Sequence, residues 1–414
     1  MGLSHCRSSH NKKKDYKMVQ VNDEDNMLLN LPSHIIIDIL SRLSTKTLSR
    51  CRCVCKLWQK LLSEPEFSSF RILRPPTTSL MIHKNSDSSF NLVEFEDEPN
   101  YHDFYCVPGT KFEQPPKGLR QNCMSMFGSV EGLISFHEFG FQNPDTVYIW
   151  NPATQESIII QSAGGVMEFP NVTSYGFGLS SKTGEYKVVR IYQEVLEENL
   201  LHVTRSDCHV YTLGSEGCWR YTGHAPFLYS CRANGVFLNG NLHWLIRDPD
   251  GKEFISCFDL DKESFQPFPA PPELDELNLA SLELYQDCLS VCDNTSDFDI
   301  VIWAMKEYGV KKSWFKQFVI DKHPIDLVGQ YYEVVRILKV FRDGEILLMW
   351  RDDLLISFNS KTNSLQRIDM NRFICAPDES DEERFPCIEA VNYASSFLSL
   401  RRFDVEMVEN TFQI

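Results

Sequence analysis

Hydrophobic residues between positions 28 and 70 recur with the period of α-helices. After Pro32, a first group repeats at offsets of 1, 4, 5 and 8, which places it on one helix face. A second group follows at spacings of 3 and 4 and stops before Pro65. Ser44 or Thr45 can cap the second helix. The first group is Ile35, Ile36, Ile39, Leu40 and Leu43; the second is Leu48, Cys51, Val54, Cys55, Trp58, Leu61 and Leu62.

This helical segment is rich in apolar residues for its size. About 40 residues carry about a dozen large apolar side chains, more than two or three short helices can bury against each other. The surplus surface must therefore meet something else. Periodicity leaves two partners open: the rest of the chain, or the helices of a separate protein.

From residue 78 the pattern changes to short alternating runs separated by turn residues, which is typical of β-strands. The pattern predicts an all-β domain over residues 71–414, following a helical module over residues 28–70. Examples of these runs are Ser79–His83, Asn91–Phe95, Thr146–Trp150, Ser157–Gln161, Tyr186–Tyr192, His209–Leu213, Val236–Leu238, Leu242–Ile246, Ile255–Leu260, Ile300–Met305, Phe315–Ile320, Glu345–Trp350 and Leu354–Phe358.

A weak unit recurs within this β domain: an aromatic strand, a polar turn and a second strand. Its aromatic positions are spaced by 61, 47, 45 and 55 residues. A four-stranded propeller blade of about 40–50 residues fits that spacing better than a sandwich strand does. With a degenerate first unit near residues 80–106, the spacing predicts a β-propeller of about six blades. A large sandwich or a pair of sheets is the alternative. The aromatic positions are Trp150, Tyr211, Phe258, Trp303 and Phe358.

Composition supports a globular chain, with 43% hydrophobic, 24% charged and 12% aromatic residues. No apolar stretch approaches the ~20 residues of a membrane span, and the N-terminus lacks a signal-peptide core. We therefore expect a cytoplasmic or nuclear protein without a membrane partner. Cys6 stands where a myristoylation start requires Ser or Thr, which favours a disordered basic leader over residues 1–27.

Charge is unevenly distributed along the chain. The whole chain has a net charge of −16. Residues 1–20, 21–27 and 28–70 carry net charges of +4, −3 and +3, which leaves −20 on residues 71–414. A large acidic domain repels phosphate backbones, which argues against a nucleic-acid partner. The basic helical module suggests an acidic partner of its own.

Residue patterns typical of catalysis or metal binding are missing from the sequence. The fourteen cysteines form no CxxC pair, and Cys51, Cys53 and Cys55 cannot converge on one ion without other ligands. No HExxH, P-loop or EF-hand sequence occurs. His243 lies in an apolar run and is expected to be a core histidine, and Asp259 is expected to form a turn. We therefore predict no catalytic residue, no cofactor and no metal.

The tryptophans of the β domain recur at blade spacing, which favours buried packing over a sugar-binding face. Loops are better candidates for a surface that binds another molecule. The candidate loops are Pro99–Pro116, Gln193–Ser206, Pro267–Leu277 and the acidic Ala376–Pro386.

The helical segment resembles the F-box. It reads Leu31-Pro-x-x-Ile-Ile-x-x-Ile-Leu-Ser-Arg-Leu-Ser-x-Lys-x-Leu-x-Arg-Cys-Arg-Cys-Val-Cys-Lys-x-Trp58, followed by Leu61-Leu62. In that family, a three-helix motif docks on SKP1, which links it to the cullin and RING subunits of a ubiquitin ligase. Two positions depart from the plant pattern: Ser44 replaces the usual Pro, and Cys51 replaces the usual Phe. The resemblance places eight residues at or beneath the SKP1-facing surface: Leu31, Pro32, Ile36, Ile39, Leu40, Leu48, Val54 and Trp58.

The β domain resembles the F-box-associated domain of plant F-box proteins, which is kelch-like in arrangement. The resemblance implies a substrate-recognition adaptor of an SKP1-cullin-F-box ligase, which binds SKP1 and a protein substrate and has no catalysis of its own. The alternatives are a ligand-binding propeller that acts as a sensor, and a propeller hydrolase or oxidase. The residues that carry the resemblance are Trp150-Asn-Pro-Ala-Thr154, Tyr175-Gly-Phe-Gly178, Glu185-Tyr-Lys-Val-Val189, Gly240-Asn-Leu-His-Trp244, Phe258-Asp-Leu260, Trp303-Ala-Met-Lys-Glu-Tyr-Gly309, Ser313-Trp314 and Asn392-Tyr-Ala-Ser-Ser-Phe397.

Overall fold

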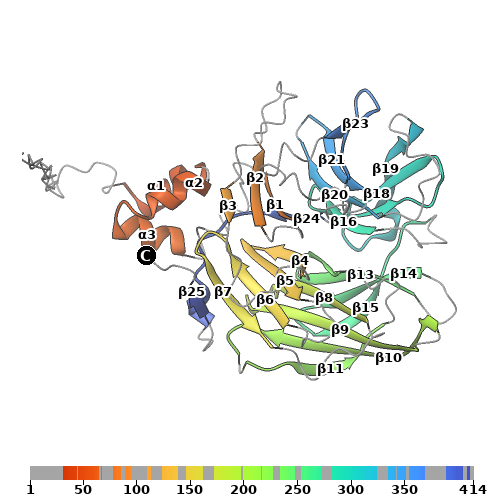
Figure 1. Ribbon diagram of the computed structural model, residues 1–414, viewed down its shortest axis with the longest axis horizontal. Coiled ribbons are helices and arrows are strands. Elements are labelled where there is room, and N and C mark those ends of the chain that lie inside the picture. The colour runs from red at the N-terminus through yellow and green to blue at the C-terminus, as the bar shows by residue number, and fades with distance from the viewer. Residues whose placement is uncertain are drawn as a thin grey trace, which may run out of the picture.

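The computed structural model shows a small helical module beside a six-bladed β-propeller (Figure 1). The predicted leader over residues 1–27 lies outside the described residues. Within the described part, no helix is both long and apolar enough to cross a membrane. The structure describes residues 31–43, 45–64, 67, 78–84, 89–95, 110–112, 124–138, 146–161, 172–196, 199–215, 217–226, 234–247, 253–272, 281–323, 334–341, 343–350, 354–368, 388–403 and 408–410.

The helical module contains the helices α1 (Ser33–Ser41), α2 (Thr45–Cys51) and α3 (Lys56–Ser63). Helix α1 begins after Pro32, whose carbonyl accepts the N–H of Ile35 at 2.9 Å. Proline suits this place because its missing N–H would have no partner in the first turn. Near the other end, Arg42 pairs with Asp38 at 2.9 Å, one helical turn away.

The strands form six sheets. Blade 1 is β1 (Thr78–Lys84), β2 (Ser89–Phe95), β3 (Thr110–Phe112) and β24 (Ile388–Tyr393). Blade 2 is β4 (Met124–Val130), β5 (Leu133–Glu138), β6 (Thr146–Asn151), β7 (Glu156–Ile160) and β25 (Val408–Asn410). Blade 3 is β8 (Val172–Leu179), β9 (Tyr186–Leu196), β10 (Asn199–Thr212) and β11 (Arg220–His224). Blade 4 is β12 (Val236–Leu238), β13 (Asn241–Arg247), β14 (Glu253–Asp259) and β15 (Ser264–Phe268). Blade 5 is β16 (Ser281–Tyr285), β17 (Cys288–Asp293), β18 (Asp299–Met305) and β19 (Trp314–Asp321), with the 3₁₀ turn η2 (Lys311–Ser313) before β19. Blade 6 is β20 (Val335–Val340), β21 (Glu345–Trp350), β22 (Leu354–Asn359) and β23 (Ser364–Ile368).

The ring closes through strands from opposite ends of the β domain. The innermost strands β24, β4, β8, β12, β16 and β20 neighbour one another in that order around the ring. Strand β24 pairs antiparallel with β1, with Leu80 opposite Asn392. The predicted first unit therefore receives its inner strand from near the C-terminus. Pairing of this kind joins the first and last parts of the propeller without a free edge.

All thirteen predicted runs lie in strands, with only Gln161, Leu213 and Leu260 one residue beyond a strand end. The five recurring aromatic positions fall on the third strand of blades 2 to 6, and every one is buried. The spacing therefore predicted the blades correctly, and the sandwich alternative is wrong. Several strands fall outside these runs, among them β11 and β15, which contain no buried residue and so show no apolar alternation.

Three of the blades repeat one turn after their third strand. A side-chain oxygen at the strand end accepts backbone N–H groups of the turn, and the fifth turn residue has a positive φ. Asp259 forms this turn, as predicted, by accepting the N–H groups of Asp261 and Lys262 at 2.9 Å. The acceptors are Asn151, Asp259 and Asn359, and the positive-φ residues are Gln155, Glu263 and Asn363.

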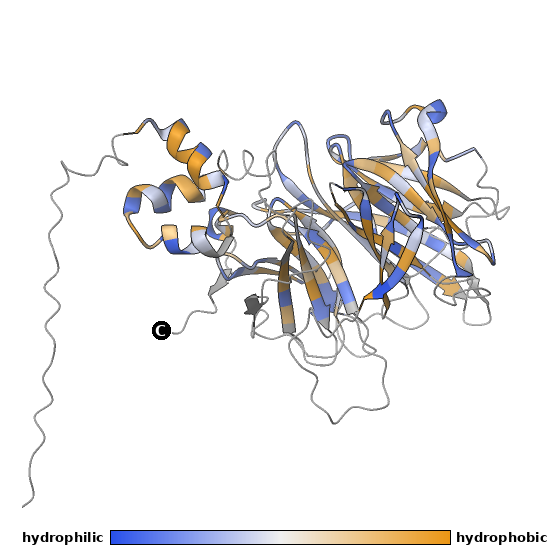
Figure 2. Cartoon of the chain, turned by 90° about the horizontal axis from the view of Figure 1, so that it is seen from above, coloured by the Kyte–Doolittle hydropathy of each residue, from blue (hydrophilic) through white to orange (hydrophobic). Residues whose placement is uncertain are grey.

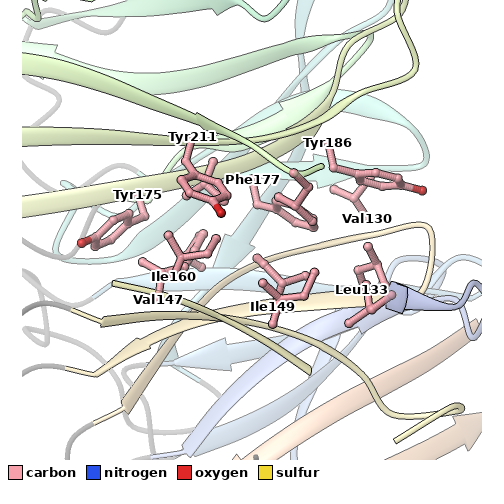
Figure 3. Close-up of a cluster of buried hydrophobic side chains, with 14 of the residues drawn as sticks. Val130, Leu133, Val147, Ile149, Ile160, Tyr175, Phe177, Tyr186 and Tyr211 are labelled. Atoms are coloured by element: carbon pink, nitrogen blue, oxygen red, sulfur yellow. The ribbon is translucent and has the colours of Figure 1, made fainter. Parts of the chain in front are cut away.

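Apolar cores fill the spaces between neighbouring blades. Figure 3 shows blades 2 and 3 facing each other, with Val147 and Ile149 on one side and Tyr175 and Phe177 on the other. Hydrophobic and hydrophilic residues alternate along the strands, as Figure 2 shows. Five of the six recurring tryptophans are buried, as predicted, and Trp219 is partly buried.

Candidate functional site

The helical module packs against the propeller on one side. Its core joins residues from all three helices to two propeller residues, Phe397 and Ala153. The surplus apolar surface therefore meets the rest of the chain in part. The buried core residues are Ile36, Leu40, Leu48, Cys51, Leu61, Leu62, Phe67 and Phe397.

The segment that receives the helices follows β24 and is attached to blade 2 through Glu156. The Glu156 carboxylate accepts the N–H of Leu400 at 2.7 Å and the hydroxyl of Ser399 at 3.0 Å. Asn151 donates from its Nδ2 to the Leu398 carbonyl at 2.8 Å. These bonds hold Phe397 in position, with none of its side chain exposed.

Arg52 covers Phe397 from the helical side. Its guanidinium lies 4.8 Å from the centre of the Phe397 ring, within the range of a cation–π contact. Burial lowers the pKa of Arg52, and the negative charge of Glu156 opposes that effect. The contact thus joins the basic module to the propeller at a place where the negative charge of Glu156 favours the charged guanidinium.

On its other side, the helical module exposes large apolar residues. Ile35 and Ile39 are one turn apart on α1, and Ile39 is 44% exposed. Val54, between α2 and α3, is 66% exposed, and Leu57 on α3 is also exposed. We call Ile35, Ile39, Val54 and Leu57 the open face. Exposed apolar surface of this kind is typical of a protein-binding site.

The eight residues predicted at or beneath the SKP1-facing surface divide into three groups. Pro32, Ile39 and Val54 are exposed; Ile36, Leu40 and Leu48 are buried; Leu31 and Trp58 are half-buried against the core. Their part in binding stays a prediction. The sequence argument missed Ile35, although it stands four residues from the predicted contact Ile39 on the same helix, and it missed Leu57 on α3.

The two departures from the F-box pattern have different outcomes. Cys51 is buried and belongs to the same core as Phe67 and Phe397, which supply aromatic bulk around the position where the plant pattern has Phe. Burial raises the pKa of the Cys51 thiol. Ser44 lies outside the described residues.

The candidate loops of the β domain are described only in part. The prediction that Gln193–Ser206 is a loop is wrong: its described residues, 193–196 and 199–206, belong to the paired strands β9 and β10, with Ser206 opposite Gln193. Both side chains are buried, and the Gln193 Nε2 donates a hydrogen bond to the Ser206 Oγ at 3.2 Å across the two strands. Ala376–Pro386 lies outside the described residues, as do most of Pro99–Pro116 and the second half of Pro267–Leu277.

His243 and Glu283 are titratable groups of the propeller whose pKa values are shifted strongly by burial. His243 is buried, and its Nδ1 lies 3.1 Å from the Val236 carbonyl. Burial lowers the pKa of His243 to about 4, so the ring is neutral, as expected of a core histidine. On β16, burial raises the pKa of Glu283 to about 8, while Arg336 lowers it. Among the described residues, no His, Cys, Asp and Glu side chains gather in a group that could hold a metal.

Comparison with known proteins agrees with this architecture. Residues 28–70 match the F-box-like family, and residues 79–393 match the F-box associated beta propeller domain. A similar F-box protein of Arabidopsis thaliana is 28% identical over 81% of this chain and 86% of its own length. An F-box/kelch-repeat protein of Arabidopsis thaliana is 24% identical over 69% and 78% of the two chains, and the F-box protein CPR1 of the same plant is 27% identical over 70% and 73%.

Among solved structures, a six-bladed fucose-binding lectin of Aleuria aurantia covers 73% of this chain and 98% of its own, at 11% identity and a TM-score of 0.39. The kelch-like description stays a prediction, because only one of the three relatives named above carries that word. The helices match one family and the propeller matches the other, in the order found in plant F-box proteins. The chain belongs to the F-box proteins that carry an F-box associated beta propeller domain.

Proposed function

We propose that this protein is the substrate-recognition adaptor of an SKP1-cullin-F-box ubiquitin ligase in the cytoplasm or nucleus. The helical module binds an SKP1-like protein, and through it the cullin and RING subunits. The propeller binds a protein substrate, and the chain itself performs no chemistry. Its contribution is to hold the substrate near the conjugating enzyme at high effective concentration.

The open face carries this proposal. The helices that match the F-box family bury one side against Phe397 and Ala153 and leave Ile35, Ile39 and Val54 exposed on the other. A helical surface that is apolar and uncovered suits the helices of a partner. The net charge of +3 over residues 28–70 favours a partner of opposite charge.

Attachment of the module to the propeller supports an adaptor role. The contact of Arg52 with Phe397 ties the helices to the β domain, and Glu156 holds the segment that carries Phe397. A substrate held on the propeller then keeps a defined position relative to the subunits bound at the helices. Free rotation between the two parts would lower the effective concentration of the substrate lysine.

The test is binding of the purified full chain to an SKP1-like protein, measured by calorimetry. We expect Ile39→Asp combined with Val54→Asp to weaken binding at least 100-fold, because each buries a charge in an apolar interface. Tyr221→Asp, a change at an exposed aromatic of blade 3, is the matched control and keeps wild-type affinity. No binding by the wild type, or full binding by the double variant, would contradict the adaptor role.

A further inference from the structure

The edge of blade 2 receives a strand from a distant part of the chain. Five of the six sheets have four strands, whereas the sheet of blade 2 has five, in the order β25-β7-β6-β5-β4. Strand β25 pairs antiparallel with β7, with Glu409 opposite Ser157. The geometry of the β7 edge therefore suits an added strand, because it holds one in this structure.

Strand β7 also differs from the other outer strands in sequence. A Lys, Arg or Pro on an outer strand discourages pairing with a further strand. Among the outer strands that the structure describes, β7 alone has none of these residues and reads Glu-Ser-Ile-Ile-Ile. An edge without such a residue favours the addition of a strand. The other outer strands carry Lys111 on β3, Arg220 on β11, Pro267 on β15, Lys316 on β19 and Arg367 on β23.

Strand β25 covers only part of this edge. It pairs with residues 156–158, and within the described part of the chain no strand pairs with Ile159 or Ile160 on that side. The Gln161 carbonyl accepts the indole N–H of Trp219 at 2.8 Å, which marks the end of the edge. Three residue pairs supply only about two to four backbone hydrogen bonds, because alternate residues of an antiparallel pair exchange them. A partner strand that spans all of β7 makes more of these bonds and can displace β25.

The edge lies beside the helical module. Ala153, in the turn before β7, belongs to the core of the module, and Glu156 holds the segment that carries Phe397. In Figure 1, β7 and β25 lie on the side of the propeller that faces α1, α2 and α3. A segment bound to β7 is therefore held close to the module, while the open face stays uncovered.

The register of β25 indicates which segments suit the edge. Only a polypeptide supplies the alternating N–H and C=O groups that pair with a strand, and its side chains then add selectivity. The register places Val408 opposite Ile158. Ile158 has no exposed surface and belongs to the core between blades 2 and 3. An apolar residue is therefore favoured at this place in a bound segment.

From these observations we infer that the edge of β7 binds an extended, proline-free segment of the protein substrate, which displaces β25 and places an apolar residue opposite Ile158. The inference rests on the proposed adaptor function. In the absence of substrate, β25 occupies the edge and prevents its pairing with other strands.

The test measures binding of a fluorescent peptide with the sequence of residues 404–414 to the full chain by anisotropy. Glu409→Pro in the chain weakens the pairing of β25 with β7, because proline donates no backbone hydrogen bond. We expect this variant to bind the peptide at least tenfold more tightly than the wild type, with slower hydrogen exchange at residues 156–160. A peptide that carries Glu409→Pro is the matched control and binds neither protein. Equal affinity of the two proteins for the unchanged peptide overturns the inference.

A reversible disulfide gives a second measurement, on one folded protein. Ser157→Cys combined with Glu409→Cys places two thiols directly opposite each other on paired strands, within reach of a disulfide. Mass spectrometry confirms this bond, since the chain has fourteen other cysteines. We expect the oxidised form to bind the peptide at least tenfold more weakly than the reduced form. Equal binding by the two forms overturns the inference.

Two further measurements separate a substrate from other occupants of the edge. Sedimentation shows whether the full chain dimerises, and a dimer that the oxidised disulfide abolishes assigns the edge to a second copy and overturns the inference. The peptide fused to a carrier protein is a model substrate for the ligase reconstituted with SKP1-like, cullin and RING subunits. We expect ubiquitin transfer to it at least tenfold faster than to a carrier whose peptide has Glu409→Pro. Equal transfer to the two carriers also overturns the inference.

Binding to an SKP1-like protein is measured in parallel. The disulfide variant keeps that binding in both redox forms. Ile39→Asp with Val54→Asp loses it but keeps peptide binding, so failure of the β7 edge and failure of the adaptor role are distinguishable.

Discussion

The guanidinium of Arg52 lies over the ring of Phe397, at 4.8 Å from its centre. The first residue directly follows helix α2, and the second follows the strand that closes the propeller ring. This one contact therefore connects the helical module to the place where the two ends of the β domain meet. The core around Phe397 covers this side of the module, and the open face remains exposed.

Phe397→Ala tests the joint between the module and the propeller. The side chain is fully buried, so its truncation leaves a cavity and should lower the free energy of unfolding by about 3–5 kcal/mol. Urea denaturation measures this loss, and limited proteolysis shows whether the helices detach first. Phe298→Ala, at an exposed phenylalanine, should change stability by less than about 0.5 kcal/mol. A small effect at Phe397 would mean that the module is not held by this core.

Glu156 should matter through its acceptor oxygens. Glu156→Ala leaves the Leu400 N–H and the Ser399 hydroxyl without their acceptor, at a cost of about 2–3 kcal/mol. Glu156→Gln keeps one acceptor oxygen and should cost about half as much. Chemical denaturation of both variants gives the comparison. Equal losses for alanine and glutamine would contradict this expectation and show that the charge of the carboxylate, and not its number of acceptor oxygens, governs the effect.

Cys51→Phe restores the aromatic residue of the usual plant pattern. Because Phe67 and Phe397 already occupy the core that contains Cys51, the larger ring should overpack it and cost about 1–3 kcal/mol. Thermal unfolding of the full chain measures the change. Cys53→Phe, at an exposed cysteine, is the control. An increase in stability for Cys51→Phe would reveal unfilled space beside the thiol.

Glu283 should make stability depend on pH. Burial raises the pKa of this carboxyl from its ordinary value of 4.5 to about 8 in the folded protein. The folded state therefore holds its proton more tightly, and the group's contribution to stability falls as pH rises from about 4.5 to 8. Glu283→Gln keeps a neutral side chain at every pH. We expect equal melting temperatures near pH 4 and a growing advantage for the variant toward pH 9. A difference that does not change with pH would contradict the raised pKa.

The blades were predictable because their signal is local. Trp150, Phe258 and Phe358 lie on the third strands of blades 2, 4 and 6. Each is followed by a turn whose first residue accepts backbone N–H groups. Strand β11 was not predictable in the same way, because this outer strand buries no residue and therefore shows no apolar alternation. The hairpin of β9 and β10 was mistaken for a loop because its outer part is rich in polar residues, which pair with each other across the strands.

The helical period was enough to show that residues 28–70 carry more apolar surface than they can bury among themselves, since periodicity and composition are properties of neighbouring residues. Which side is covered depended on residues far away in the chain. Ala153 and Phe397 contact the helices in the folded protein, where β24 closes the ring beside them. Glu156 holds the segment that carries Phe397. Ile39 and Ile36 have the same chemistry and stand three positions apart, yet one is open and the other buried. Long-range packing made that distinction, because burial depends on what arrives from elsewhere in the fold.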